Sequence, residues 1–135
     1  MSRSARSAYE ATSKAAASSR DLEAGALFKA ARQLEAVRSS WDAADRELRL
    51  EEALRYNQRL WTFFQSELSA PEHPLPRELR ANLLRLSTFV DRRTFELLRS
   101  PSVAGLDALI AINREIAAGL SATPPDASSR EGTAP

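Results

Sequence analysis

The chain has 135 residues, of which 43% are hydrophobic, and its 19 basic and 18 acidic residues leave a net charge of +1. This size fits one compact domain, and the balanced charge gives no bulk attraction to nucleic acid or to an anionic membrane. The lack of cysteine excludes disulfides, thiolate metal sites and cysteine nucleophiles. Because no apolar run approaches the ~20 residues that span a bilayer, the sequence predicts a soluble protein in the cytosol.

Residues 1–17 are rich in Ser, Ala and Arg and carry a single acid, Glu10. This composition predicts a flexible N-terminal arm, with an organellar transit peptide as the alternative. Ser18, three residues before Asp21, predicts a capping box at the start of the first helix. Apolar residues at heptad spacing follow as far as Trp41, and the helix is expected to end near Ser39.

The densest apolar segment runs from Leu50 to Leu68 and predicts a central helix. Its seam residues recur at a 4-3-4-3-4 spacing, which places them on one side of the helix, with Asn57 in the middle of the seam. Asp42 or Asp45 is expected to cap the N-terminus of this helix. Pro71 forbids its continuation, so the helix should end near Ala70.

The segment from Pro71 to Pro76 holds three prolines and predicts a stiff turn, after which Pro76 can occupy the first turn of a third helix. A second, patchy face of this helix carries Leu84, Thr88 and Phe95 and is expected to remain partly outside the core. The expected seam of the third helix consists of Leu79, Leu83, Leu86, Val90 and Leu97.

A fourth helix is expected to begin between Ser100 and Leu106, again with an asparagine, Asn113, in its apolar seam. Gly119 is placed to cap its C-terminus in the left-handed conformation. Residues 121–135 have the composition of a disordered tail.

Together, these patterns predict an all-α fold, a small antiparallel bundle of about four helices spanning residues 18–120. The residues expected to form its core are Trp41, Trp61, Phe64, Leu86, Val90 and Ile116.

The two seam asparagines, Asn57 and Asn113, are each followed closely by an arginine, Arg59 and Arg114. A buried asparagine costs stability unless it is hydrogen-bonded, so one interpretation is that the pair fixes helix register, by bonding to each other or to a loop backbone. The alternative is that they anchor the backbone of a bound partner segment, with the two arginines at the rim.

No catalytic or metal-binding pattern is present, so the sequence predicts a protein that is not an enzyme and that uses no cofactor. The single histidine, His73, is expected to be an exposed loop residue. The third helix has a local excess of arginine, which is typical of a solvated face, although it offers contact to RNA phosphate or to an acidic protein.

The sequence resembles the FlaF family of flagellar biosynthesis regulators from flagellated alphaproteobacteria, over about residues 8–120. One departure is Ala111, at a position where relatives commonly carry Asp. The matching pieces, in order, are Ala8-Tyr9, the Asp21–Leu34 helix with Leu27-Phe28, Asn57-Gln58-Arg59-Leu60-Trp61 with Phe64, Leu75-Pro76, the Leu83–Val90 segment, and Leu109-Ile110-Ala111-Ile112-Asn113-Arg114 followed by Gly119-Leu120.

The resemblance implies a small cytoplasmic bacterial protein that binds flagellin as a secretion chaperone and couples flagellin synthesis to export. One alternative is a post-transcriptional regulator that acts through the FlbT regulator or on flagellin messenger RNA, and another is an adaptor at the export apparatus. Direct contact with nucleic acid is not expected from the balanced charge. The residues expected to bind a protein partner are Asn57, Arg59, Phe63, Leu84, Phe95, Asn113 and Arg114.

Overall fold

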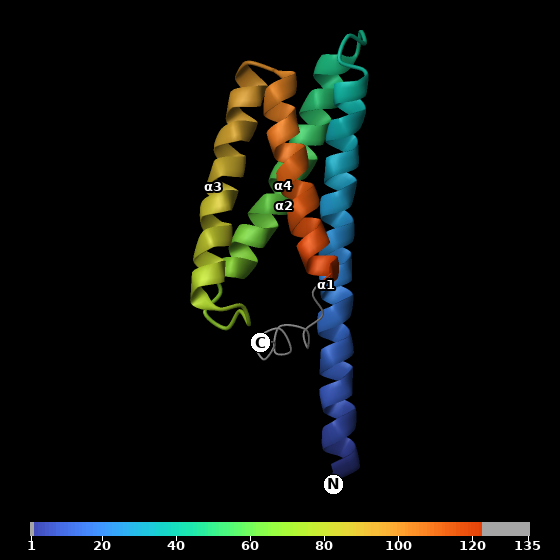
Figure 1. The fold of residues 1–135 in the computed structure, drawn as a ribbon, viewed down its shortest axis with the longest axis vertical. Coiled ribbons are helices and arrows are strands. Elements are labelled where there is room, and N and C mark those ends of the chain that lie inside the picture. Colours follow the sequence, from blue (N-terminus) through green and yellow to red (C-terminus); the bar gives the residue numbers. More distant parts are fainter. Residues whose placement is uncertain (1, 123–135) are drawn as a thin grey trace, which may run out of the picture.

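The computed structural model describes the backbone of residues 2–122 and the side chains of residue 7 and residues 19–121. It contains four α-helices and, within the described residues, no strand. Each helix runs antiparallel to the next (Figure 1), which confirms the predicted all-α antiparallel bundle. The helices are α1 (Ser2–Ser39), α2 (Arg46–Ser69), α3 (Arg77–Arg99) and α4 (Val103–Ala122).

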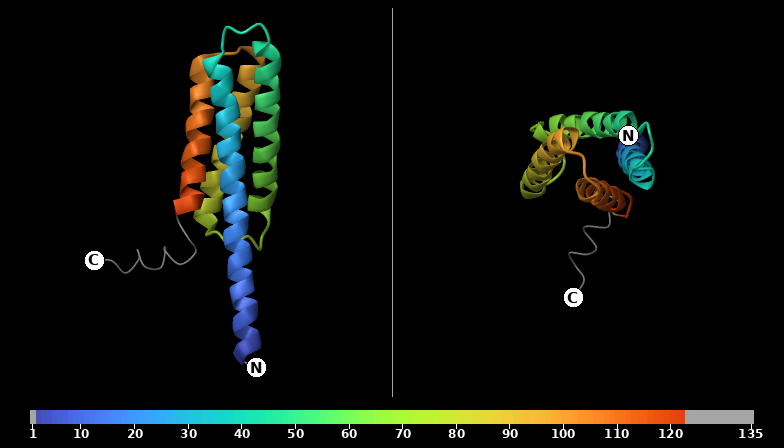
Figure 2. Two further views of the ribbon diagram at one scale, coloured as in Figure 1. Left: turned by 90° about the vertical axis from the view of Figure 1, so that its right-hand side faces the viewer. Right: turned by 90° about the horizontal axis from the view of Figure 1, so that it is seen from above.

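The four helices surround a common core, with α1 packed along α4 and against α2, and with α3 packed against α2 and α4 (Figure 2). At the end that contains the α1–α2 and α3–α4 connections, α1 lies close to α2 and α3 lies close to α4, and the helices of each pair separate toward the other end (Figure 1). At the opposite end α1 continues well beyond the bundle (Figure 1). The two ends therefore differ, and we call the first the closed end and the second the open end.

The first helix begins at Ser2 rather than near Asp21. The predicted capping box is wrong, because no helix terminus exists at that point in the chain. Residues 2–24 contain neither glycine nor proline and are rich in alanine, which has the highest helix propensity, so nothing interrupts the helix before its docked half. The predicted tail falls mostly outside the described residues, although α4 reaches Ala122.

Three of the expected core residues, Trp61, Phe64 and Val90, are buried as predicted. Trp41, Leu86 and Ile116 are only partly buried and pack against the edge of the core, so their predicted placement is wrong. Trp41 lies at the α1–α2 turn. There the guanidinium of Arg46 covers its ring at 4.3 Å, which leaves the indole at the boundary with solvent.

The buried face of α3 also departs from the predicted seam, because it includes Ser87 and Thr94 and leaves Leu79 44% exposed. The two hydroxyls donate to backbone carbonyls of their own helix, Ser87 to Leu84 at 2.7 Å and Thr94 to Val90 at 2.8 Å. Because these hydrogen bonds satisfy the hydroxyls locally, both residues can face the core without an unpaired polar group. An apolar pattern alone does not detect such positions.

The helix ends near the prolines follow the prediction closely. Ala70 is extended (φ −69°, ψ 130°) before Pro71, and Pro76 occupies the N-cap position of α3. Asp45 stands at the N-cap of α2, but its side chain makes no capping hydrogen bond. Gly119 lies inside α4 and does not have positive φ, so the predicted left-handed cap is wrong. The helix continues because Leu120 still packs against the core.

Candidate functional site

A cavity of about 440 Å³ opens at the end of the bundle where α1 extends past its neighbours. All four helices and the α2–α3 turn contribute to it, and most of its surface is apolar. This volume is in the range of ~300–1,000 Å³ that is typical of ligand sites. Its lining residues are Ser19, Arg20, Glu23, Trp61, Phe63, Phe64, Glu67, Leu68, His73, Pro74, Leu75, Leu83, Ile116 and Leu120.

The aromatic wall of the cavity is fixed by packing within α2. The rings of Trp61 and Phe64 meet edge to face, with centroids 5.8 Å apart, and Phe63 follows at 6.0 Å from Phe64. Trp61 is only 1% exposed and Phe64 only 7%, whereas Phe63 is 51% exposed. The wall therefore passes from the core to the solvent edge along a single turn of helix.

The floor of the cavity depends on the α2–α3 turn. Leu75 is apolar within a proline-rich segment and packs partly buried against the core. Its backbone N–H donates to Nδ1 of His73 at 3.2 Å. His73 is thus partly buried and lines the cavity, so the prediction that it is an exposed loop residue is wrong. The imidazole stabilises the turn because it accepts a hydrogen bond from a backbone N–H that lies between two prolines.

A chain of buried hydrogen bonds crosses the core from this wall. The indole N–H of Trp61 donates to Oδ1 of Asn113 at 2.9 Å, and Nδ2 of Asn113 donates to Oδ1 of Asn57 at 2.7 Å. Both asparagines are fully buried. This confirms the interpretation that the seam asparagines bond to each other, and it links α2 to α4 diagonally across the bundle. Nδ2 of Asn57 has no partner among the described residues.

Charged groups gather at the rim of the cavity. Glu23 of α1 and Glu67 of α2 both line it, and no ion pair joins either of them to another described residue. Burial raises the pKa of Glu23, the negative charge of Glu67 raises it further, and Arg20 partly offsets both by lowering it. The rim therefore holds a carboxylate whose charged form is disfavoured by its surroundings.

The predicted site residues fall in different places. Phe63 lines the cavity, while Phe95 is 58% exposed on α3. Leu84 is partly buried and packs against the core, although it was expected to lie outside. Arg59 is exposed on α2. The structure therefore brings only one predicted apolar contact residue to the cavity, and binding by the others stays a prediction.

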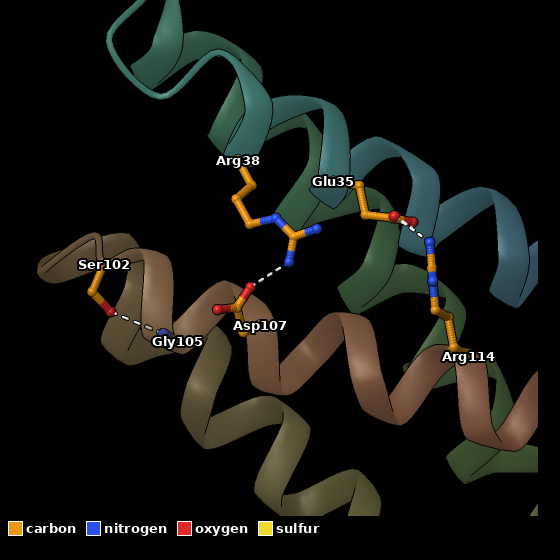
Figure 3. A network of polar contacts seen from close by, with 6 residues as sticks. All are labelled: Glu35, Arg38, Ser102, Gly105, Asp107 and Arg114. Carbon is orange, nitrogen blue, oxygen red and sulfur yellow. Dashed lines mark hydrogen bonds and ion pairs between the residues drawn. The ribbon is translucent and has the colours of Figure 1, made fainter.

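Arg114 forms an ion pair with Glu35 of α1, and Arg38 of α1 pairs with Asp107 of α4 at 2.5 Å (Figure 3). These two contacts join α1 to α4 along their solvent-exposed edge. Arg114 lowers the pKa of Glu35 by hydrogen bonding to its carboxylate. Arg114 therefore has a partner within the bundle.

Sequence reasoning missed most of the cavity, including Glu23, Glu67, Leu75 and Leu120. One signal was present in the sequence: Leu75 is a large apolar residue between two prolines of the turn, and the structure packs it against the core. Among the described residues, no group of three or more His, Asp or Glu side chains is arranged to hold a metal ion. None of the helices in residues 2–122 is long and apolar enough to cross a membrane.

The fold and the site define an all-helical bundle with an apolar cavity at one end, and the spaces between bundle helices are among the places where proteins hold ligands. The family model described as flagellar protein FlaF matches residues 5–120 of this chain. The chain therefore belongs to the FlaF family and is a flagellar protein. No curated protein and no solved structure matched it.

Proposed function

We propose that this protein binds flagellin as a secretion chaperone in the cytoplasm and thereby couples flagellin synthesis to export and flagellum assembly. The observation that carries the proposal is the apolar cavity at the open end of the bundle. Flagellin has amphipathic terminal segments that are liable to polymerise early. A cavity with room for a few apolar anchor side chains suits the apolar face of such a helix, which would be shielded until export.

The first test is coexpression with flagellin from the same organism, followed by size-exclusion chromatography with multi-angle light scattering. The proposal expects a soluble complex of defined stoichiometry that contains both chains. Flagellin eluting alone, with this protein in a separate peak, would contradict it.

A pair of variants then maps the contact surface. Phe63→Asp places a charge at the cavity mouth, whereas Phe95→Asp places the same charge on the outer face of α3. Both side chains are more than half exposed, so both variants should fold. The proposal expects Phe63→Asp to weaken flagellin binding more strongly than Phe95→Asp. The reverse order would move the contact surface to α3.

The alternative function, regulation of flagellin synthesis through FlbT or messenger RNA, is supported by a different surface. Arg77, Arg85, Arg92 and Arg99 are all exposed and recur every seven or eight residues along α3. This spacing puts them on one face of the helix. If coexpressed FlbT coelutes with the protein while flagellin does not, and glutamine at Arg85 and Arg92 abolishes that coelution, this function is favoured instead.

A further inference from the structure

The chemistry of the cavity rim narrows what can occupy the cavity. Two carboxylates, Glu23 and Glu67, face it together with one guanidinium, Arg20. Nδ1 of His73, which also lines the cavity, accepts a hydrogen bond from the backbone N–H of Leu75. Among the described lining residues, acidic side chains therefore outnumber basic ones by two to one beside an apolar floor.

The other groups that face the cavity do not offset this surplus. The lining residues from α4, Ile116 and Leu120, are apolar, and so is Leu83 from α3. Ser19 of α1 is uncharged. Glu23 and Glu67 share the rim with Arg20, and both burial and the negative charge of Glu67 act against the charged form of Glu23.

We propose that the cavity takes an amphipathic helix of flagellin in which a lysine or arginine borders the apolar anchors, and that Glu67 and Glu23 pair with this cation. The inference rests on the proposed function and specifies the chemistry of the bound segment. Long basic side chains can lay their methylene stems along an apolar wall while the charged end reaches a carboxylate at the rim. Phe63 and Leu120 line the same cavity as the two acids and provide apolar surface there.

The experiment uses the full chain and monomeric flagellin in isothermal titration calorimetry. Glu67→Gln removes a rim charge and keeps the side-chain shape, and Glu23→Gln does the same from α1. Glu52→Gln is the matched control, because Glu52 is an exposed acid of α2 outside the cavity. Circular dichroism verifies that all three variants keep the wild-type helix content.

The inference expects Glu67→Gln to weaken binding about fivefold or more at low salt, while Glu52→Gln leaves it unchanged. It also expects the wild-type affinity to fall with salt more steeply than that of Glu67→Gln, since screening weakens charge pairs. If flagellin binds and all three variants behave alike, the inference is wrong while the proposed function stands. If wild-type protein does not bind flagellin, both fail.

Proton linkage gives a second readout that depends on the sign of the occupant's charge. A cation that enters the rim lowers the pKa of Glu23, so binding at mildly acidic pH should release protons. Titrations in two buffers of different ionisation enthalpy measure this release, and Glu23→Gln should reduce it. Proton uptake that disappears in Glu23→Gln would show that the occupant brings apolar or acidic groups to the rim, and would overturn the inference.

Discussion

Two glycines of α4 offer a matched test of how closely the helices approach at the closed end of the bundle. A Cβ atom added at Gly105 would lie 2.6 Å from Cδ2 and 3.1 Å from Cγ of Leu97, a core residue of α3. A Cβ added at Gly119 meets nothing within 4 Å. Both glycines belong to α4, so alanine at each position changes helix propensity in the same direction. Any difference in stability between the two variants then reports on packing.

The expected magnitudes follow from these contacts. Replacing glycine by alanine inside a helix gains about 1 kcal/mol when nothing else changes. Gly119→Ala should therefore raise the free energy of unfolding by about 0.5–1 kcal/mol. At Gly105 the same gain is opposed by overpacking against a buried side chain, which costs about 1–3 kcal/mol. The two variants should differ by about 1–3 kcal/mol, with Gly105→Ala the less stable.

Urea denaturation, followed by circular dichroism, measures the free energy of unfolding of both variants. An unchanged slope of this free energy against urea concentration shows that the surface exposed on unfolding is unchanged. Leu97→Val combined with Gly105→Ala tests the mechanism, because trimming the contacting side chain should recover part of the loss and give a non-additive double mutant. If Gly105→Ala is stabilised as much as Gly119→Ala, α3 and α4 do not approach as described, and the contrast between a closed end and an open end fails.

Two further predictions concern the links between helices. Asn113→Ala leaves the Trp61 indole N–H and the Asn57 side-chain carbonyl oxygen unpaired in the core. The free energy of unfolding, measured by urea titration, should therefore fall by about 2–5 kcal/mol. A loss below about 1 kcal/mol would contradict the buried chain of hydrogen bonds. Glu35 has a pKa lowered by Arg114, so its contribution is present above its ordinary pKa and lost as pH falls through the lowered one. Glu35→Gln should therefore be slightly less stable than wild type at neutral pH and equal to it in acid, and a gap that widens in acid would refute this assignment.

Most of the fold could be predicted from the sequence because periodicity and prolines act locally. The spacing of Leu50 to Leu68 defined α2, and Pro71 and Pro76 defined the turn that follows. The start of α1 was missed because a capping pattern at Ser18 competes with an alanine-rich segment that has no helix breaker. A capping pattern predicts the start of a helix only where the residues before it cannot themselves be helical.

The site was harder to predict, since it depends on which residues of different helices meet. The pairing of Asn57 with Asn113 was one of two open interpretations, and only the relative placement of α2 and α4 decides for it. Nothing in the local sequence of Glu23 and Glu67 reveals that they share a cavity rim. Ser87 and Thr94 are buried polar residues whose hydroxyls hydrogen-bond to carbonyls of their own helix. A hydropathy pattern does not identify such positions as buried.

The two tryptophans of the chain lie in separate environments, and this has a practical consequence. Trp61 is buried beside the cavity with its indole N–H bonded to Asn113, whereas Trp41 stacks against Arg46 at the α1–α2 turn. With Trp41 replaced by phenylalanine, the tryptophan fluorescence of the protein would come from Trp61 alone. Its emission wavelength and quenching would then report directly on water at the cavity wall, without any attached dye, as a partner enters or leaves.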